Sequence, residues 1–151
     1  MEERRVASSI TGAEAEGPLA IGRAYTFSKT VAESDVYLFA GITGDFHPNH
    51  VDEEYMAGTR YGRRIAHGAL SVGYMSSCST LVCQALGNRP AVNYGYDRIR
   101  FLAPVFIGDT LTMTYTIAER DDETGRILSE VTATNQRGEL VTVATNILKL
   151  V

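Results

Sequence analysis

The chain has 151 residues, 44% of them apolar and 21% charged, which suits one globular domain with a core of its own. Eighteen acidic against fourteen basic side chains give a net charge of −4, so a non-specific nucleic-acid binder is disfavoured. No apolar run reaches the roughly 18 residues that a membrane span needs, so we expect neither nucleic-acid nor membrane partners.

Residues 1–22 are rich in Glu, Ala, Ser and Gly and show no clean hydrophobic period, so we predict a loosely ordered N-terminal arm. Ala24–Thr30 then alternates in the way that a strand does and predicts a first strand. Thr30 and Glu33 have the spacing of a capping box. We expect them to start a short helix that ends near Gly41–Gly44.

The polar segment Gly44–His50 follows, and Pro48 within it excludes a continuous helix. Asp52–Ala57 predicts one short helical turn, and Gly58–Arg64 predicts a loop. Most of the unusual polar residues of the chain lie in this region, which makes it the first place to look for chemistry.

Gly68–Leu86 is the longest helical candidate, and a Gly-Asn-Arg-Pro sequence ends it. Its faces carry small or apolar residues and almost no charge, and such a helix is usually buried on most sides. Cys78 and Cys83 lie five positions apart in this helix and point in different directions, so we expect no disulfide between them. Reduced thiols predict a cytoplasmic location.

After residue 90 the hydrophobic period changes from 3.6 to 2, and a change of phase near Asp97 and Arg98 predicts a bulge. Four strands with no helix between them exclude parallel crossovers, so we expect an antiparallel sheet. Residues 23–151 are therefore predicted to form a single α+β domain, in which a curved antiparallel sheet wraps around one long central helix. The four strands are expected within residues 92–101, 111–117, 127–135 and 140–150.

All three histidines, His47, His50 and His67, fall in the polar region before the long helix. Two imidazoles separated by two residues suggest a metal site, but Pro48 constrains the geometry, and neither an H-E-x-x-H helix nor cysteine ligands accompany them. The loop also lacks the glycine spacing of a phosphate-binding loop, and no G-x-S-x-G hydrolase motif is present. We therefore expect no metal and no bound cofactor.

Asp45 and His50 offer a carboxylate–imidazole pair that a loop constrained by Pro48 can fold toward one point. Such a pair can hold one water between its members, and an imidazole titrates near neutrality, which suits acid–base work. The alternative is structural, because an Asp or His beside a proline turn often satisfies its own backbone. The residues by themselves leave both interpretations open.

Three motifs now bear on this choice: Gly44–His50, Arg64–Gly68 and Arg100–Leu111. Together they resemble the MaoC-like (R)-specific enoyl-CoA hydratases of the hotdog fold. The resemblance covers about residues 20–150, which is nearly the whole chain. It implies a hotdog domain that adds water reversibly to a 2-enoyl-CoA thioester, giving a 3-hydroxyacyl-CoA, with coenzyme A as part of the substrate.

The resemblance implies roles for single residues. Asp45 and His50 become the catalytic pair that activates water. Gly68, at the start of the long helix, matches the glycine whose backbone N–H faces the thioester oxygen, where enolate charge develops. Ser76 matches a position that supports the active-site loop in some members. His67 precedes the helix, and we expect it to hold the loop beside the substrate.

Other polar residues of the region are candidate substrate contacts. Arg64, with Arg60 and Arg63, could meet the phosphates of coenzyme A. The family usually has Asn in place of His47 and an aliphatic residue in place of Asn49, so we expect a more polar pocket wall here. A short acyl group, or one that carries a carboxylate, would suit such a wall.

Two alternatives to the hydratase remain open. The first is acyl-CoA thioester hydrolysis on the same fold, and the second is a non-catalytic acyl-CoA-binding subunit of a hetero-oligomer. The resemblance also implies a homodimer or an assembly of dimers, in which two sheets join edge to edge with the acyl pocket at the junction. An exposed edge strand in a five-stranded sheet agrees with that expectation.

Overall fold

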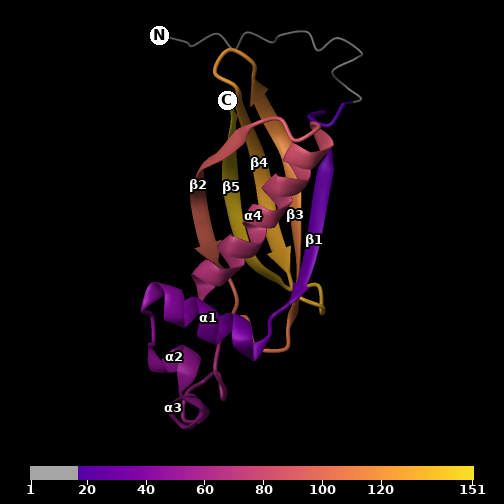
Figure 1. The fold of residues 1–151 in the computed structure, drawn as a ribbon. Helices are drawn as coiled ribbons and strands as arrows, with labels where there is room; N and C mark the ends of the chain where they lie inside the picture. The colour runs from indigo at the N-terminus through magenta and orange to yellow at the C-terminus, as the bar shows by residue number, and fades with distance from the viewer. Residues whose placement is uncertain (1–16) are drawn as a thin grey trace, which may run out of the picture.

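A computed structural model describes residues 17–151 (Figure 1). Its five strands form one sheet in the order β1-β3-β4-β5-β2, and every neighbouring pair is antiparallel. The predicted α+β architecture is confirmed, with β1 and β2 at the two edges of the sheet. The elements are β1 (Ala24–Thr30), α1 (Glu33–Thr43), α2 (Pro48–Val51), α3 (Glu53–Ala57), α4 (Gly68–Ala85), β2 (Ala91–Phe101), β3 (Thr110–Asp121), β4 (Arg126–Thr134) and β5 (Leu140–Leu150).

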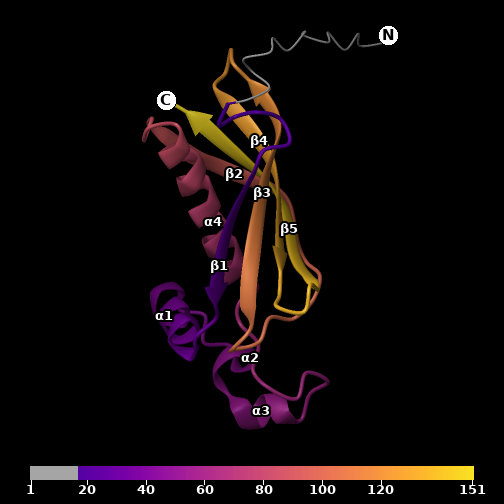
Figure 2. The same ribbon diagram turned by 90° about the vertical axis from the view of Figure 1, so that its right-hand side faces the viewer.

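The long helix α4 lies across one face of the sheet, and the opposite face carries no described helix (Figures 1 and 2). Side chains alternate along a strand, so one half of β3 faces α4 and is buried, while its four threonines lie on the other face. The buried half consists of Leu111, Met113, Tyr115 and Ile117. On α4, the buried positions include Leu70, Tyr74 and Cys78, which share one face of the helix.

The start of α1 differs from the prediction. Ala32 is the N-cap residue, and the carboxylate of Asp35 accepts the Ala32 N–H at 2.8 Å. Thr30 and Glu33 do not form the predicted box, because β1 continues through Thr30. The Thr30 hydroxyl lies 2.7 Å from that of Thr110 in β3. Thr30, which the local spacing assigned to the start of the helix, therefore pairs in the sheet instead.

Two further features refine the prediction. Pro48 starts the one-turn helix α2, where proline is tolerated because its missing N–H would have no helical partner. The bulge near Asp97 and Arg98 is confirmed, since the β2–β5 register shifts between Asp97 and Arg100, and Arg98 has a φ of 55°. A second register shift lies between Asn93 and Gly95 and was not predicted.

Of the predicted arm over 1–22, residues 1–16 lie outside the described part of the chain. Residues 17–22 form turns that pack on the sheet, where Ala20 is buried and the Gly22 N–H donates to the Ile117 carbonyl at 2.8 Å. These residues thus belong to the folded domain rather than to an arm.

Two sequence expectations concern the helices. Within residues 17–151, no helix has both the length and the hydropathy that crossing a bilayer requires. Cys78 is buried and Cys83 half-buried, and both are free thiols, as their spacing in α4 predicted.

Candidate active site

The helices α1, α2 and α3 gather at one end of the sheet, at the N-terminus of α4 (Figure 1). Gly44 ends α1 with a φ of 79°, a left-handed conformation that glycine adopts at little cost. The chain then passes through Asp45 into α2, which carries His50. His67 is the N-cap residue of α4. One polar side-chain atom from each of Asp45, His50 and His67 lies within 4.8 Å of the others.

The imidazole of His50 is held in one tautomer. Its Nδ1 lies 2.7 Å from the backbone carbonyl oxygen of Ile65. A carbonyl can only accept, so Nδ1 carries the proton and Nε2 keeps its lone pair. Burial lowers the pKa of His50 below its ordinary value, and this outweighs the opposing effects of the Ile65 hydrogen bond and the Asp45 charge. A neutral His50 with a free Nε2 is equipped to act as a base.

His67 connects the two members of the predicted pair. Its Nε2–H donates to the backbone carbonyl of Asp45 at 2.9 Å, and its ring stacks on that of His50 with centroids 3.7 Å apart. The Phe39 ring also contacts His67, with centroids 4.8 Å apart, and only 2% of His67 is exposed. Its Nδ1 is buried with no hydrogen-bond partner among residues 17–151. His67 therefore has the contacts of a residue that positions Asp45 and His50.

These residue types also bind zinc, so the geometry needs a direct test. His50 Nδ1 and His67 Nε2 are each already bonded to a backbone oxygen. The two rings are inclined by only 26°, so their in-plane lone pairs run side by side instead of converging. His47 instead caps α2, because its Nδ1 accepts the Asn49 N–H. The arrangement fits an acid–base pair better than a metal centre.

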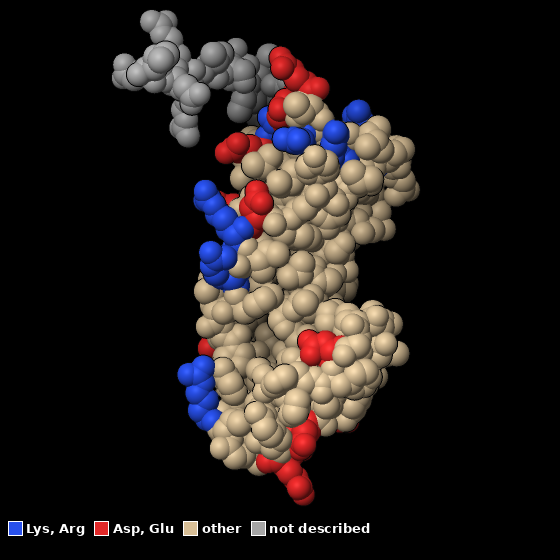
Figure 3. Space-filling view, turned by 90° about the vertical axis from the view of Figure 1, so that its left-hand side faces the viewer, with Lys and Arg blue, Asp and Glu red and all other residues tan. Residues whose placement is uncertain are grey.

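A cavity of about 470 Å³ opens beside His50. Figure 3, which faces the β2 edge, shows the surface hollowed between the sheet and the helical end. Much of the wall is apolar and comes from the end of β2 and the segment after it, while Arg60, Ser71 and Thr142 add polar groups. The lining residues are His50, Arg60, Tyr61, Ile65, Ala66, Gly68, Ser71, Phe101, Leu102, Ala103, Pro104, Val105 and Thr142.

Gly68 lies in this wall as the first residue of α4. A helix leaves its first N–H groups without intrahelical partners, and no acceptor from the described residues meets the N–H of Gly68. A Cβ at this position would lie 2.9 Å from the ring of Phe101. The absence of a side chain thus lets the Phe101 ring approach the helix terminus.

None of the four predicted substrate contacts, Arg64, Asn49, Ser76 and His67, lines the cavity. Arg64 donates to Glu53 of α3 at 2.7 Å, and to Tyr37 and Glu33 of α1 at 2.9 Å and 2.6 Å. It therefore connects α1 to α3, and the two glutamates neutralise its charge. Asn49 acts through its backbone, whose carbonyl accepts the Ile65 N–H at 3.0 Å. Ser76 is half-buried in α4, about two turns after Gly68.

Other lining residues were not singled out from the sequence. Ser71 lies one turn after Gly68 on the same helix, and that spacing could have indicated it. Thr142 comes from β5 and has no local pattern that points to the site. His47 and Asn49 are absent from the lining, so they give no argument for a polar wall.

The antiparallel sheet and the single long helix across it define a hotdog-fold protein, and the Asp–His cluster at the helix N-terminus is its candidate acid–base site. Residues 16–139 match the model of the MaoC-like domain, and the chain belongs to that family.

Known relatives agree with this assignment. The chain is 43% identical over 99 residues to an (R)-specific enoyl-CoA hydratase of Rhodospirillum rubrum, a match that covers 64% of each chain. It is 32% identical over 129 residues to a protein of the same name from Aeromonas caviae, covering 82% of this chain and 93% of the relative. Among solved structures, the unliganded R-hydratase PhaJ1 of Pseudomonas aeruginosa superimposes with a TM-score of 0.77 at 30% identity, covering 91% of this chain and 84% of that one.

Proposed function

We propose that the chain catalyses the (R)-specific hydration of a 2-enoyl-CoA to a 3-hydroxyacyl-CoA and the reverse dehydration. The observation that carries this proposal is the position of a neutral His50, with Nε2 free, in the wall of the cavity that also contains Gly68 at the start of α4. Relatives named as (R)-specific enoyl-CoA hydratases support the same reaction.

In the proposed reaction, Asp45 and His50 hold one water. The Nε2 of His50 takes a proton from the water while its oxygen forms a bond to C3 of the substrate, and the C2–C3 double bond shifts toward the carbonyl. The proton then passes to C2, so that H and OH have been added across the double bond. This addition involves no net oxidation or reduction, and we propose that it needs neither a metal nor a redox cofactor.

The charge that builds up on the thioester oxygen needs stabilisation. The N–H of Gly68 is proposed to donate to that oxygen, and α4, with 18 residues, places the positive end of its dipole there. Removal of such a donor costs on the order of 10²–10³ in rate in enzymes where it has been tested.

We also propose that two copies of the chain pair through β2. This strand is an unpaired edge of the sheet, and such edges are sites of strand pairing. Val92, Tyr94 and Phe101 are each about half exposed, as is Leu102 after the strand, although side chains of this kind are usually covered. Light scattering distinguishes a dimer from the 16.5 kDa monomer.

The test uses the purified full chain with enoyl-CoA thioesters from crotonyl-CoA to decenoyl-CoA and one dicarboxylic analogue. The proposal predicts loss of the conjugated thioester absorbance, an (R)-3-hydroxyacyl product and no free thiol. Release of coenzyme A instead would identify a thioesterase. Binding without turnover would indicate an acyl-CoA-binding subunit. The dependence of kcat/KM on chain length measures how apolar the acyl pocket is.

A further inference from the structure

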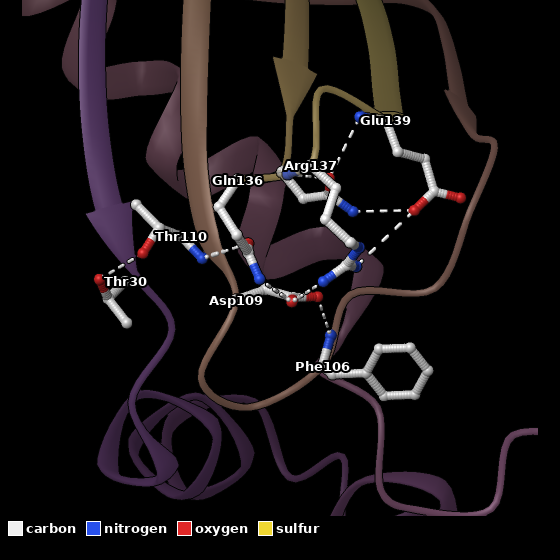
Figure 4. A network of polar contacts seen from close by, with 8 residues as sticks. Thr30, Phe106, Asp109, Thr110, Gln136, Arg137 and Glu139 are labelled. Atoms are coloured by element: carbon white, nitrogen blue, oxygen red, sulfur yellow. Dashed lines mark hydrogen bonds and ion pairs between the residues drawn. The ribbon is translucent and has the colours of Figure 1, made fainter.

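A buried carboxylate, that of Asp109, lies at the end of the sheet near Gln136 and Arg137 (Figure 4), and it does not line the cavity. Asp109 is 2% exposed and precedes β3. Its Oδ1 accepts from Gln136 Nε2 at 2.8 Å and from Arg137 Nη1 at 3.1 Å, both in the turn between β4 and β5. Its Oδ2 accepts the backbone N–H of Phe106 at 2.9 Å. One side chain thus fixes the β2–β3 connection to a turn 27 positions further along the chain.

Phe106 is the link between this carboxylate and the candidate active site. It forms an isolated antiparallel bridge with Ile65, and beside it the Ala66 N–H donates to the Val105 carbonyl at 2.7 Å. The carbonyl of the same Ile65 accepts from His50 Nδ1. The carbonyl that His50 contacts therefore belongs to the residue that pairs with Phe106, and Asp109 holds Phe106 through its backbone N–H.

The segment that carries Ile65 continues directly into His67 and Gly68. A displacement of Ile65 would consequently move the carbonyl that selects the His50 tautomer and the start of α4 together. The ring of Phe106 is held as well, because the Arg63 guanidinium lies 4.0 Å from its centroid.

We propose that Asp109 is a positioning residue for the acid–base pair, acting through the Phe106–Ile65 bridge on the tautomer and orientation of His50. This inference rests on the proposed function and extends it to a residue that touches no substrate.

The charge state of Asp109 suits this task. Burial by itself would raise the pKa of its carboxyl, but hydrogen bonds from the Phe106 N–H, Gln136 and Arg137 outweigh that effect and hold the pKa below its ordinary value. The group is ionised at neutral pH, and charge-assisted hydrogen bonds of this kind are stronger and more directional than neutral ones.

The experiment compares three variants of the full chain. Asp109→Asn removes the charge and one acceptor at constant size. Arg137→Met removes one of the three donors to Asp109, together with a 3.8 Å ion pair to Glu139; because this side chain is half exposed, we expect the variant to fold even if Asp109→Asn does not. Asp121→Asn is the matched control, because that carboxylate also accepts backbone N–H groups, at the opposite end of β3.

Two readouts separate positioning from simple stability. Nitrogen-15 histidine NMR reports the tautomer of His50 without any substrate, and steady-state kinetics reports kcat and KM for hydration. We expect Asp109→Asn to give a mixture of His50 tautomers and a kcat lower by roughly 10- to 100-fold, with a smaller change in KM. Arg137→Met shifts both readouts in the same direction by less, and Asp121→Asn leaves both near wild type.

The inference is overturned if folded Asp109→Asn, or Arg137→Met where the first does not fold, keeps the single Nδ1–H tautomer and the wild-type kcat. A lower unfolding temperature with both readouts unchanged also overturns it, since Asp109 would then be structural only. If the wild-type chain hydrates no enoyl-CoA, the proposed function fails. The tautomer comparison then still decides whether Asp109 positions His50.

Discussion

The imidazole rings of His50 and His67 stack with centroids 3.7 Å apart and planes inclined by 26°. Each ring also bonds to a backbone carbonyl, that of Ile65 for His50 and that of Asp45 for His67. The stack therefore joins the loop after α1, the helix α2 and the start of α4 into one unit. His67 holds this unit together from a buried position, which explains why a histidine with no access to the cavity lies beside the acid–base pair.

Replacement of His67 by Phe tests this relationship. A phenyl ring keeps the stack on His50 and removes the unpartnered Nδ1, so we expect the free energy of unfolding to change by no more than about 1 kcal/mol. The lost hydrogen bond to the Asp45 carbonyl frees the loop, and we expect kcat to fall roughly tenfold. Urea unfolding and initial rates measure the two effects. Unchanged kcat would show that the hydrogen bond does not position Asp45.

The start of α4 is tested by Gly68→Ala. The new Cβ would lie 2.9 Å from the Phe101 ring, but the three nearest atoms all belong to that side chain and none to the backbone, so we expect the variant to fold with the ring displaced. The methyl group and the displaced ring then obstruct the thioester, and kcat/KM should fall by on the order of 10²-fold.

Gly73→Ala is the control for this substitution, because a Cβ at Gly73 of the same helix meets nothing within 4 Å. Alanine favours a helix interior over glycine by about 1 kcal/mol, so this variant should be as stable as wild type or slightly more so, with normal activity. Equal activity of Gly68→Ala and Gly73→Ala would remove Gly68 from the mechanism.

The pH dependence of catalysis follows from His50. Its pKa is lowered by burial, and the base is active only when neutral. We therefore expect kcat/KM to be constant at neutral pH and to decline only on the acid side, with a midpoint below about pH 6.5. A midpoint above that value would contradict the assignment of His50 as the base.

Acid stability depends on Asp109. Its pKa is lowered in the folded chain, so its contribution to the free energy of unfolding is complete above the ordinary Asp value near pH 3.9 and is lost as the pH falls through the lower folded value. Wild type should exceed Asp109→Asn in stability near pH 7, with a margin that shrinks below about pH 4. Urea unfolding at several pH values measures it, and a constant margin would contradict the assigned pKa shift.

Features that depend on local pattern were predictable from the sequence. The alternation of Leu111 to Ile117 gave β3 and its buried face, and the lack of charge from Gly68 onward gave the central helix. Asp45 and His50 were indicated by residue type and spacing, and the structure brings their side chains together.

Features that depend on pairing across the chain were not predictable. The partners of Arg64 and the link from Asp109 to Gln136 join residues far apart in the sequence, and no local period encodes them. His47 and Asn49 adjoin the acid–base pair in sequence, yet the one-turn helix α2 directs them elsewhere. Where the backbone turns sharply, as it does around α2, residues that are adjacent in the sequence can have side chains that point in different directions.

The most direct test of the account is the hydration rate of Asp45→Asn, His50→Gln and the double variant, measured with the enoyl-CoA that the wild type prefers. Asp45 is half exposed and His50 lies outside the core, so all three should fold. Each single variant is predicted to lose about 10²–10⁴-fold in kcat, and the double variant little more, because both residues act on one water. Near-wild-type turnover in either single variant, or losses that multiply in the double variant, would contradict the Asp45–His50 pair.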